Sequence, residues 1–195
     1  LEERHLTPDD IDIVILTHCH FDHVMNVDLF KKSQVLVSKT EYDYAINLHT
    51  KDEMKRKNNK NSLVPEDIFT PTYIKDILDK VNLKTVCGDE AVTKNVKLVK
   101  TPGHTPGHIS VLLNNKGKRV IIASDAVHFF TELFSKKLIL TYGSVEDGKR
   151  SIDFILKNSD IIIPGHDRPC VVKNGKVTYS DVREREWDIE IISYV

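Results

Sequence analysis

One stretch of the sequence reads Ile11-Asp12-Ile13-Val14-Ile15-Leu16-Thr17-His18-Cys19-His20-Phe21-Asp22-His23. Its first part is nearly continuous in apolar, mostly β-branched residues, which predicts a strand buried on both faces. His18 and His20 are two residues apart, so in extended backbone their side chains point to the same side. Asp22 and His23 follow where the chain turns and can face a second position. Because imidazole and carboxylate groups suit Zn²⁺, Mn²⁺ and Fe²⁺, this stretch could supply ligands to two adjacent metal ions.

Three further clusters of potential ligands each follow a predicted strand. They are His104 in the Pro- and Gly-rich loop 101–108, Asp125 after the strand 120–123, and His166 after the strand 160–163. A single histidine in a loop is usually structural. Four clusters that all lie at strand ends instead predict one shared site.

The rest of the chain alternates short strands with a few helices. Further strands are predicted at 35–37, 96–99 and 109–113, and helices at 39–48, 73–81 and 144–157. Ser144 is the expected N-cap of the last helix. Asn174-Gly175 is the expected turn of a hairpin over 171–177. Strands mixed with helices, without an internal repeat, favour a layered α/β domain.

The ordered ligand pattern resembles that of the metallo-β-lactamase-fold hydrolases, and the resemblance extends from Ile11 to Val172. It implies an α/β fold of four layers, αββα, with the site along one edge. It also implies two metal ions: one held by His18, His20 and His104, and a second held by Asp22, His23 and His166, with Asp125 bridging the two.

The implied cofactors are two divalent metal ions, zinc in the first place, with manganese or iron as alternatives. Two such ions about 3.5–4 Å apart lower the pKa of a shared water, and the resulting bridging hydroxide attacks a carbonyl carbon. Asp22 is expected to be catalytic as well, because it can pass a proton to the leaving group. Thr17, His108 and Asp167 are candidates for orienting the ligand rings by hydrogen bonds.

Within the superfamily, the chain is most similar to the N-acyl homoserine lactonase-like branch, followed by the glyoxalase II-like branch. The lactonase-like branch often places a tyrosine three residues after the bridging aspartate, as a hydrogen-bond donor to the substrate carbonyl. Here that position is His128, which is expected to donate the same bond as a catalytic residue. Tyr142 is a second candidate donor.

The chain has 195 residues, with 28 Lys and Arg against 29 Asp and Glu, so its formal net charge is −1. This size predicts a single domain over 1–195, with residues 39–94 as a helical and loop insertion within it. Because so little sequence precedes Ile11, the resemblance implies a domain that lacks its N-terminal strands. Residues 51–62 are polar and predict an exposed loop.

Composition also limits the partners. A near-neutral charge argues against binding nucleic acid, and no apolar run is long enough to cross a membrane. Three cysteines, Cys19, Cys87 and Cys170, imply no disulfide framework and a cytoplasmic location. Cys19 is expected to point into the core. The expected partner is a small-molecule substrate, and Trp187 and the tail 189–195 could form a homodimer surface.

The leading interpretation is a dinuclear metal-dependent hydrolase of a small ester, lactone or thioester. A glyoxalase II-type thioesterase is one alternative, although Arg183 and Arg185 alternate with glutamates and form no clear basic cluster. A mononuclear iron persulfide dioxygenase and an inactive metal-binding remnant are the others.

Overall fold

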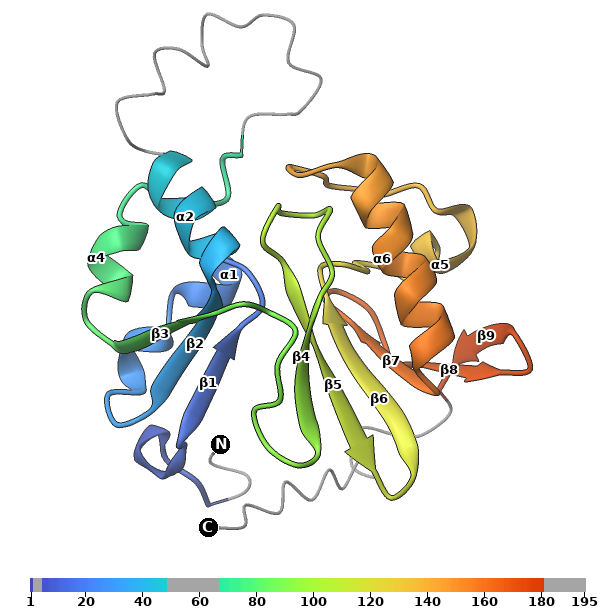
Figure 1. The fold of residues 1–195 in the computed structure, drawn as a ribbon, viewed down its shortest axis with the longest axis horizontal. Coiled ribbons are helices and arrows are strands. Elements are labelled where there is room, and N and C mark those ends of the chain that lie inside the picture. Colours follow the sequence, from blue (N-terminus) through green and yellow to red (C-terminus); the bar gives the residue numbers. More distant parts are fainter. Residues whose placement is uncertain (2–4, 49–66, 181–195) are drawn as a thin grey trace, which may run out of the picture.

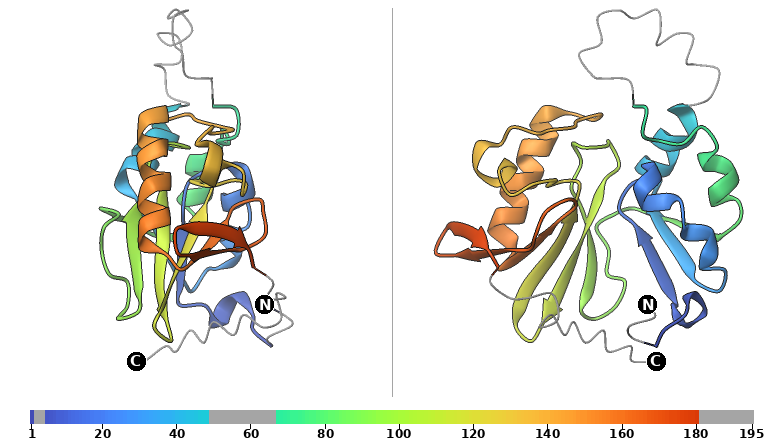
Figure 2. Two further views of the ribbon diagram at one scale, coloured as in Figure 1. Left: turned by 90° about the vertical axis from the view of Figure 1, so that its right-hand side faces the viewer. Right: turned by 180° about the vertical axis from the view of Figure 1, so that it is seen from behind.

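The computed structural model describes Leu1, residues 5–48 and residues 67–180. Two sheets lie against each other in the middle of the molecule, and helices cover their outer faces (Figures 1 and 2). The predicted loop at 51–62 and the predicted dimer surface with Trp187 lie outside the described residues. The α/β class and the αββα layering are confirmed.

The first sheet has the strand order β1-β2-β3, and both pairings are parallel. Parallel neighbours need crossover connections, which here contain helices that cover the outer face of the sheet. The elements of this half are the 3₁₀ helices η2 (Pro8–Asp10) and η3 (Val27–Leu29), the strands β1 (Ile13–Leu16), β2 (Gln34–Ser38) and β3 (Asn82–Val86), and the helices α1 (Phe21–Val24), α2 (Lys39–Leu48) and α4 (Ile74–Leu78).

The second sheet has the order β4-β5-β6-β7-β8-β9. Only β6 and β7 pair in parallel, and α6 lies in the crossover between them. The elements of this half are the strands β4 (Val96–Lys100), β5 (Ile109–Asn115), β6 (Lys118–Ser124), β7 (Ile161–Pro164), β8 (Cys170–Lys173) and β9 (Lys176–Tyr179), and the helices α5 (Glu132–Ser135) and α6 (Val145–Asn158).

Three hydrophobic clusters match the three interfaces of a four-layer molecule. Along β2, Val35 and Val37 pack with α2 and α4, whereas Leu36 packs with residues of β4 and β5. Along β6, Ile121 packs with α6, whereas Ile122 faces the first sheet. Because successive side chains of a strand point to opposite faces, one strand contributes to two cores.

Three sequence predictions about this half of the molecule were wrong in detail. The predicted strand at 11–17 is not buried on both faces, because β1 is an edge strand among the described residues and Ile13 is 37% exposed. The range 39–94 contains the strand β3, which pairs with β2 over five residues. Most of its side chains are partly or fully exposed, so its apolar pattern is too weak to be read from the sequence. The predicted helix 73–81 is shorter and ends at Leu78.

Predictions based on local signals hold more closely. The Ser144 side chain accepts a hydrogen bond from the Asp147 N–H at the start of α6, as an N-cap does. Asn174 and Gly175 both have positive φ between β8 and β9, which is the geometry of a type I′ hairpin turn. Cys19 is fully buried in the core beneath the first sheet, as expected.

The two sheets meet where β1 and β5 approach each other. The Ile109 N–H donates to the Thr17 carbonyl over 3.0 Å, and the Thr17 and Ser124 hydroxyls are 3.1 Å apart. These contacts bring the loops after β1, β4 and β6 to one edge of the sandwich. The histidine stretch and the later ligand candidates are therefore neighbours in space.

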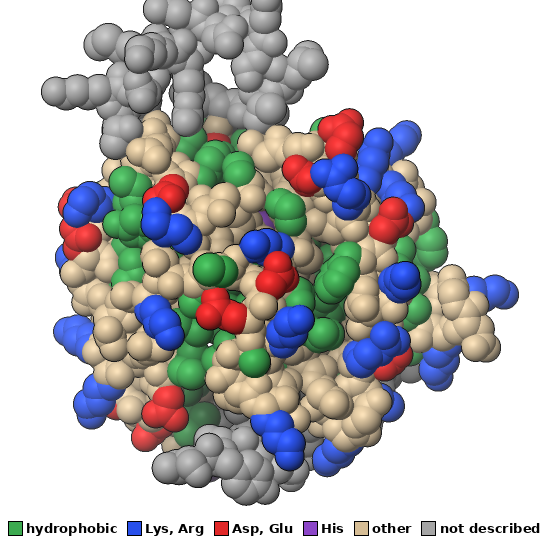
Figure 3. All heavy atoms as spheres, in the orientation of Figure 1, with side chains coloured by type: hydrophobic (Ala, Val, Ile, Leu, Met, Phe, Trp, Pro, Cys, Tyr) green, Lys and Arg blue, Asp and Glu red, His purple; other side chains and the backbone are tan. Residues whose placement is uncertain are grey.

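On the face shown in Figure 3, acidic and basic side chains are interspersed, and histidine is almost entirely hidden. Among the described residues, no helix combines the length and apolar character that a membrane crossing requires.

Candidate metal centre

The structure brings all seven predicted ligands together in two adjoining groups. The ligand atoms of each group lie within 4.8 Å of one another. The first group, His18, His20, His104 and Asp125, is buried. The second group, Asp22, His23 and His166, is partly exposed. One group lies inside the protein and the other opens to solvent, which is the side from which a substrate can arrive.

Asp125 connects the two groups. Its Oδ2 lies 3.5 Å from Nε2 of His104 and 3.3 Å from Nε2 of His166, while its Oδ1 lies 3.5 Å from Nε2 of His23. Burial alone would raise the pKa of Asp125, but the imidazoles of His128 and His23 hold it well below its usual range. A carboxylate that stays ionised between two groups of nitrogen donors is suited to bridge two cations.

Hydrogen bonds at the far nitrogen turn two of the buried rings toward Asp125. The Thr17 hydroxyl is 3.2 Å from Nδ1 of His18, and the Leu140 carbonyl is 3.1 Å from Nδ1 of His104. In both rings Nε2 is therefore the nitrogen that faces the site. Burial and neighbouring imidazoles hold the pKa of His18 well below its usual value and lower that of His104 to about 3. Both rings are thus neutral at neutral pH, as metal ligands must be.

His20 is oriented the opposite way. Its Nε2 lies 3.3 Å from Oδ2 of Asp67, and its Nδ1 lies 2.9 Å from Nε2 of His104. The Tyr44 and Thr70 hydroxyls also donate to Asp67. Burial would raise the pKa of Asp67, but hydrogen bonding with His20 outweighs it and keeps the carboxylate ionised. Nδ1 of His20 is therefore the atom that faces the site.

Several imidazole nitrogens lack any hydrogen-bond partner within the described part of the chain. Nε2 of the candidate ligands His18 and His23 is buried in this way. An unpartnered buried polar atom is costly unless something completes it. The donor set of imidazole nitrogens and carboxylate oxygens fits divalent transition metals such as zinc, and a metal ion would satisfy these atoms.

His128 lies at the same centre. Its Nε2 is 3.3 Å from Oδ2 of Asp125, and its ring lies 4.6 Å from that of His104 in a T-shaped contact. Its Nδ1 is 3.6 Å from Oε2 of Glu132. Burial would lower the pKa of His128, but Asp125 and Glu132 outweigh it and raise the pKa to about 9. His128 therefore offers an N–H donor beside the two groups.

A family model described as the metallo-beta-lactamase superfamily matches residues 1–166. The chain belongs to this superfamily. It is 29% identical over 164 residues to the N-acyl homoserine lactonase AiiA of Bacillus thuringiensis subsp. kurstaki, covering 82% of this chain and 57% of the relative. It is 26% identical over 177 residues to the N-acyl homoserine lactonase AttM of Agrobacterium fabrum, covering 82% of this chain and 59% of that protein.

Solved structures of the superfamily agree with this assignment. An N-acyl homoserine lactone hydrolase with N-hexanoyl-L-homoserine bound at its catalytic metal centre superposes with a TM-score of 0.65 at 27% identity. The match covers 86% of this chain and 60% of that one. A putative metallo-beta-lactamase from Thermotoga maritima gives 0.62 at 26% identity, covering 87% and 73%. The chain spans less than two thirds of the length of the curated lactonases named above.

Two carboxylates of this metallo-beta-lactamase domain support the site, although the sequence analysis did not single them out. Asp67 contacts His20, as described above. Glu41 is fully buried at the start of α2, where it accepts from the Cys19 N–H over 3.0 Å, the Thr105 hydroxyl over 2.7 Å and the Gly107 N–H over 3.1 Å. Cys19 lies between two candidate ligands and Thr105 follows another, so Glu41 ties two ligand loops together. No local sequence signal marks either carboxylate.

Three residues were predicted to orient the ligand rings, and not all of them do so in this metallo-beta-lactamase domain. Thr17 orients His18, as predicted. His108 is buried, with its ring 5.2 Å from that of His18 and its Nδ1 2.9 Å from the Thr101 hydroxyl. Asp167 instead accepts from the Phe130 N–H and the Tyr179 hydroxyl, so it holds a loop rather than a ligand ring.

Tyr142, the second candidate donor, is buried. Its ring packs edge-on against His20 at 5.4 Å and His104 at 5.9 Å. Its backbone N–H donates to the His104 carbonyl over 2.7 Å. The position of Tyr142 thus supports the loop that carries His104.

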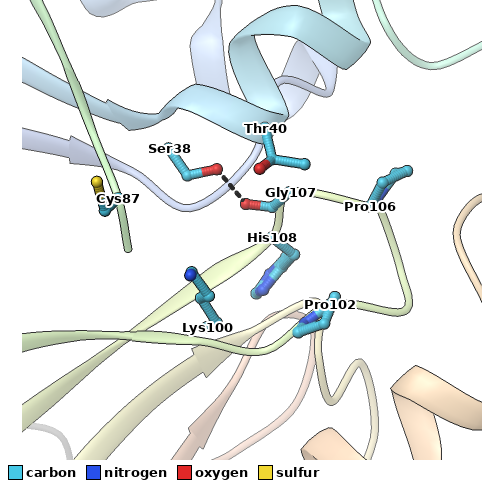
Figure 4. A pocket seen from close by; sticks show the side chains of 8 residues that line it. All are labelled: Ser38, Thr40, Cys87, Lys100, Pro102, Pro106, Gly107 and His108. Atoms are coloured by element: carbon cyan, nitrogen blue, oxygen red, sulfur yellow. Dashed lines mark hydrogen bonds between the residues drawn. The ribbon is translucent and has the colours of Figure 1, made fainter. Parts of the chain in front are cut away.

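A small pocket of this metallo-beta-lactamase domain lies beside the 101–108 loop (Figure 4). It is lined by Ser38, Thr40, Cys87, Lys100, Pro102, Pro106, Gly107 and His108. The Ser38 hydroxyl donates to the Gly107 carbonyl over 2.6 Å at its wall. None of the seven candidate ligands lines this pocket, so it is separate from the metal centre.

Proposed function

We propose that the chain forms the catalytic domain of a dinuclear metal-dependent hydrolase. The observation that carries this proposal is the pair of adjoining ligand groups with Asp125 between them. One ion would be held by Nε2 of His18, Nδ1 of His20 and Nε2 of His104. The other would be held by Asp22, His23 and His166, with Asp125 bridging both.

When bound, two divalent ions would supply a water of lowered pKa and polarise a carbonyl oxygen. Zinc is the proposed metal, because neutral imidazoles and carboxylates are its usual ligands outside thiolate sites. Manganese or iron can occupy similar sites.

Two residues of the chain are proposed to act on the substrate directly. Asp22 is 37% exposed at the open side of the centre, with Oδ2 3.5 Å from Nε2 of His23 and 3.6 Å from Nε2 of His166. From there its carboxylate can accept the proton that the attacking water loses and pass it to the leaving oxygen or sulfur. His128 can donate from Nε2 to the substrate carbonyl oxygen, because this atom faces the centre, 3.3 Å from Oδ2 of Asp125.

A lactone is the proposed substrate class, with other small esters and thioesters as weaker candidates. The relatives named as N-acyl homoserine lactonases support this choice. Apolar rings border the open side of the site: Phe21 stacks with Phe69, and Phe129 lies 6.4 Å from the His166 ring. We also propose that the enzyme acts in the cytoplasm, on the ground of its few cysteines.

The test is metal content together with hydrolysis. Freshly purified chain and its H104A variant are analysed by elemental mass spectrometry and then assayed against a panel of lactones and thioesters. H5A is the matched control, because His5 is exposed and is not part of the cluster. About two zinc or manganese ions per chain, lost in H104A and kept in H5A, would support the proposal.

Two results would contradict it. One iron per chain with thiol-dependent oxygen consumption would favour the dioxygenase alternative. Hydrolysis that persists in H104A would exclude the proposed centre.

A further inference from the structure

Glu132 is a buried carboxylate beside the metal centre that the proposed reaction does not use. It lies in α5, and only 1% of its surface is exposed. Its Oε2 accepts from the N–H groups of His128 over 2.6 Å and Phe129 over 3.2 Å. Its Oε1 accepts from the Ile139 N–H over 2.7 Å. Burying an ionised carboxylate to this extent costs free energy unless hydrogen-bonding or charged groups compensate it, and a further partner is present.

That partner is the ring of His128. Nδ1 of His128 lies 3.6 Å from Oε2 of Glu132, and Nε2 lies at the opposite end of the ring, 3.3 Å from Oδ2 of Asp125. The ring is also stacked on His166, with centroids 5.8 Å apart and an interplanar angle of 14°. Rotating the ring by half a turn would place carbon atoms against both carboxylates. The two carboxylates therefore define one orientation.

Hydrogen bonds also hold the backbone of the segment that carries His128. The His166 N–H donates to the His128 carbonyl over 3.1 Å, which joins the two loops. Through Ile139, Glu132 also contacts the segment whose Leu140 carbonyl is 3.1 Å from Nδ1 of His104. One carboxylate thus connects two histidines of the centre.

We propose that Glu132 is a positioning residue that holds Nδ1 of His128, so that Nε2 of His128 is presented to the substrate at the metal centre. The pattern follows a general one in which a carboxylate at the outer nitrogen fixes the direction of a functional imidazole. The effect on kcat that this inference predicts rests on the proposed hydrolytic function. The orientation of the ring that it predicts does not.

The kinetic test is a double-mutant cycle of E132Q with H128F, measured on the best lactone of the panel. We expect E132Q to lower kcat about 10- to 100-fold, with a much smaller change in KM. In the H128F background the same substitution should lower kcat less than about twofold, because the group that it positions is already gone. E146Q, at the exposed start of α6, is the control and should leave kcat unchanged.

Equal losses of kcat in both backgrounds would overturn the proposal, because Glu132 would then act only by holding the backbone. Circular dichroism and thermal unfolding of each variant establish that the folds are comparable.

The orientation is tested separately by long-range ¹H–¹⁵N NMR of the histidine rings in the metal-free chain. We expect a proton on Nδ1 of His128 that exchanges slowly with solvent in the unmutated protein, is absent in H128F and exchanges faster in E132Q. An unprotonated Nδ1 would overturn the proposal even if E132Q failed to fold. If no substrate of the panel is hydrolysed, the hydrolase proposal fails, whereas this measurement still decides the role of Glu132.

Discussion

Glu41 contacts both loops that carry the buried histidines, although it is not itself a candidate ligand. Its three donors come from positions 19, 105 and 107, and these are 22 to 66 residues away along the chain. Burial raises the pKa of Glu41 to about 7, while the donors oppose this shift. The carboxyl group therefore titrates at a higher pH in the folded chain than in the unfolded one.

The stability of the metal-free chain should depend on this group. Between the unfolded pKa of 4.5 and the folded pKa of about 7, the folded state binds more protons than the unfolded state. The contribution of Glu41 to the free energy of unfolding therefore decreases as the pH rises through that window. E41Q cannot titrate, so its urea-unfolding free energy should fall less than that of the unmutated chain between about pH 5 and pH 8. Parallel profiles for the two chains would contradict this expectation, and E146Q serves as the control.

Asp67 acts on a single ligand. Its carboxylate contacts Nε2 of His20, so it holds Nδ1 of that ring toward the site. We expect D67N to weaken metal binding about tenfold, because partners at the outer nitrogen of a ligand histidine typically contribute 10- to 100-fold. Competition with a chromophoric chelator measures this affinity. D76N, an exposed change in α4, should bind metal like the unmutated chain, and unchanged affinity in D67N would show that Asp67 does not orient His20.

At the scale of elements, the 101–108 loop packs directly on the start of α2. A Cβ at Gly107 would collide with the backbone nitrogen and Cα of Glu41. The Gly107 N–H and carbonyl are both hydrogen-bonded there, to Glu41 and Ser38. A residue without a side chain is therefore required for the loop to reach this helix.

G107A should destabilise the chain by about 1–3 kcal/mol, the usual cost of overpacking a well-packed contact. Urea unfolding gives the value, and metal content reports whether the His104 loop has moved. G117N is the control for a substitution without crowding, because Gly117 lies in the β5–β6 turn with open space around it, and its φ of +81° leaves backbone strain as the cost. Equal stability of G107A and the unmutated chain would show that the loop can shift without loss.

At the scale of the whole molecule, the metal centre joins the two halves of the sandwich. His18, His20 and His23 follow β1 of the first sheet, whereas His104, Asp125 and His166 follow strands of the second sheet. Bound metal would therefore cross-link the sheets at one edge.

Removal of metal should lower the thermal stability of the whole chain. A ligand present at 1,000 times its Kd stabilises the folded state by about 4 kcal/mol. For a chain of this length, that corresponds to a rise in Tm of about 10 °C. Calorimetry with and without a chelator should show this difference in the unmutated chain and a much smaller one in H104A. An unchanged Tm after complete metal removal would mean that the two halves do not depend on the centre.

Signals that act over a few residues could be read from the sequence alone. The spacing of His18, His20, Asp22 and His23 indicated one face and then a second, and the structure places these residues in two adjoining groups. Ser144 and Asn174-Gly175 predicted a helix start and a turn, because caps and tight turns are set by neighbouring residues. The α/β class followed from the same local patterns, and the αββα layering followed from the family resemblance.

Only the tertiary structure decided which groups hold the histidines in place. Glu41, Asp67 and Glu132 lie in segments that carry no motif, and a buried carboxylate is recognised only by the donors that folding brings to it. The exposed strand β3 was missed because its pairing with β2, rather than its own apolar pattern, holds it in the sheet. Local sequence thus determined the candidate ligands, whereas contacts between residues far apart in the chain determined their orientation.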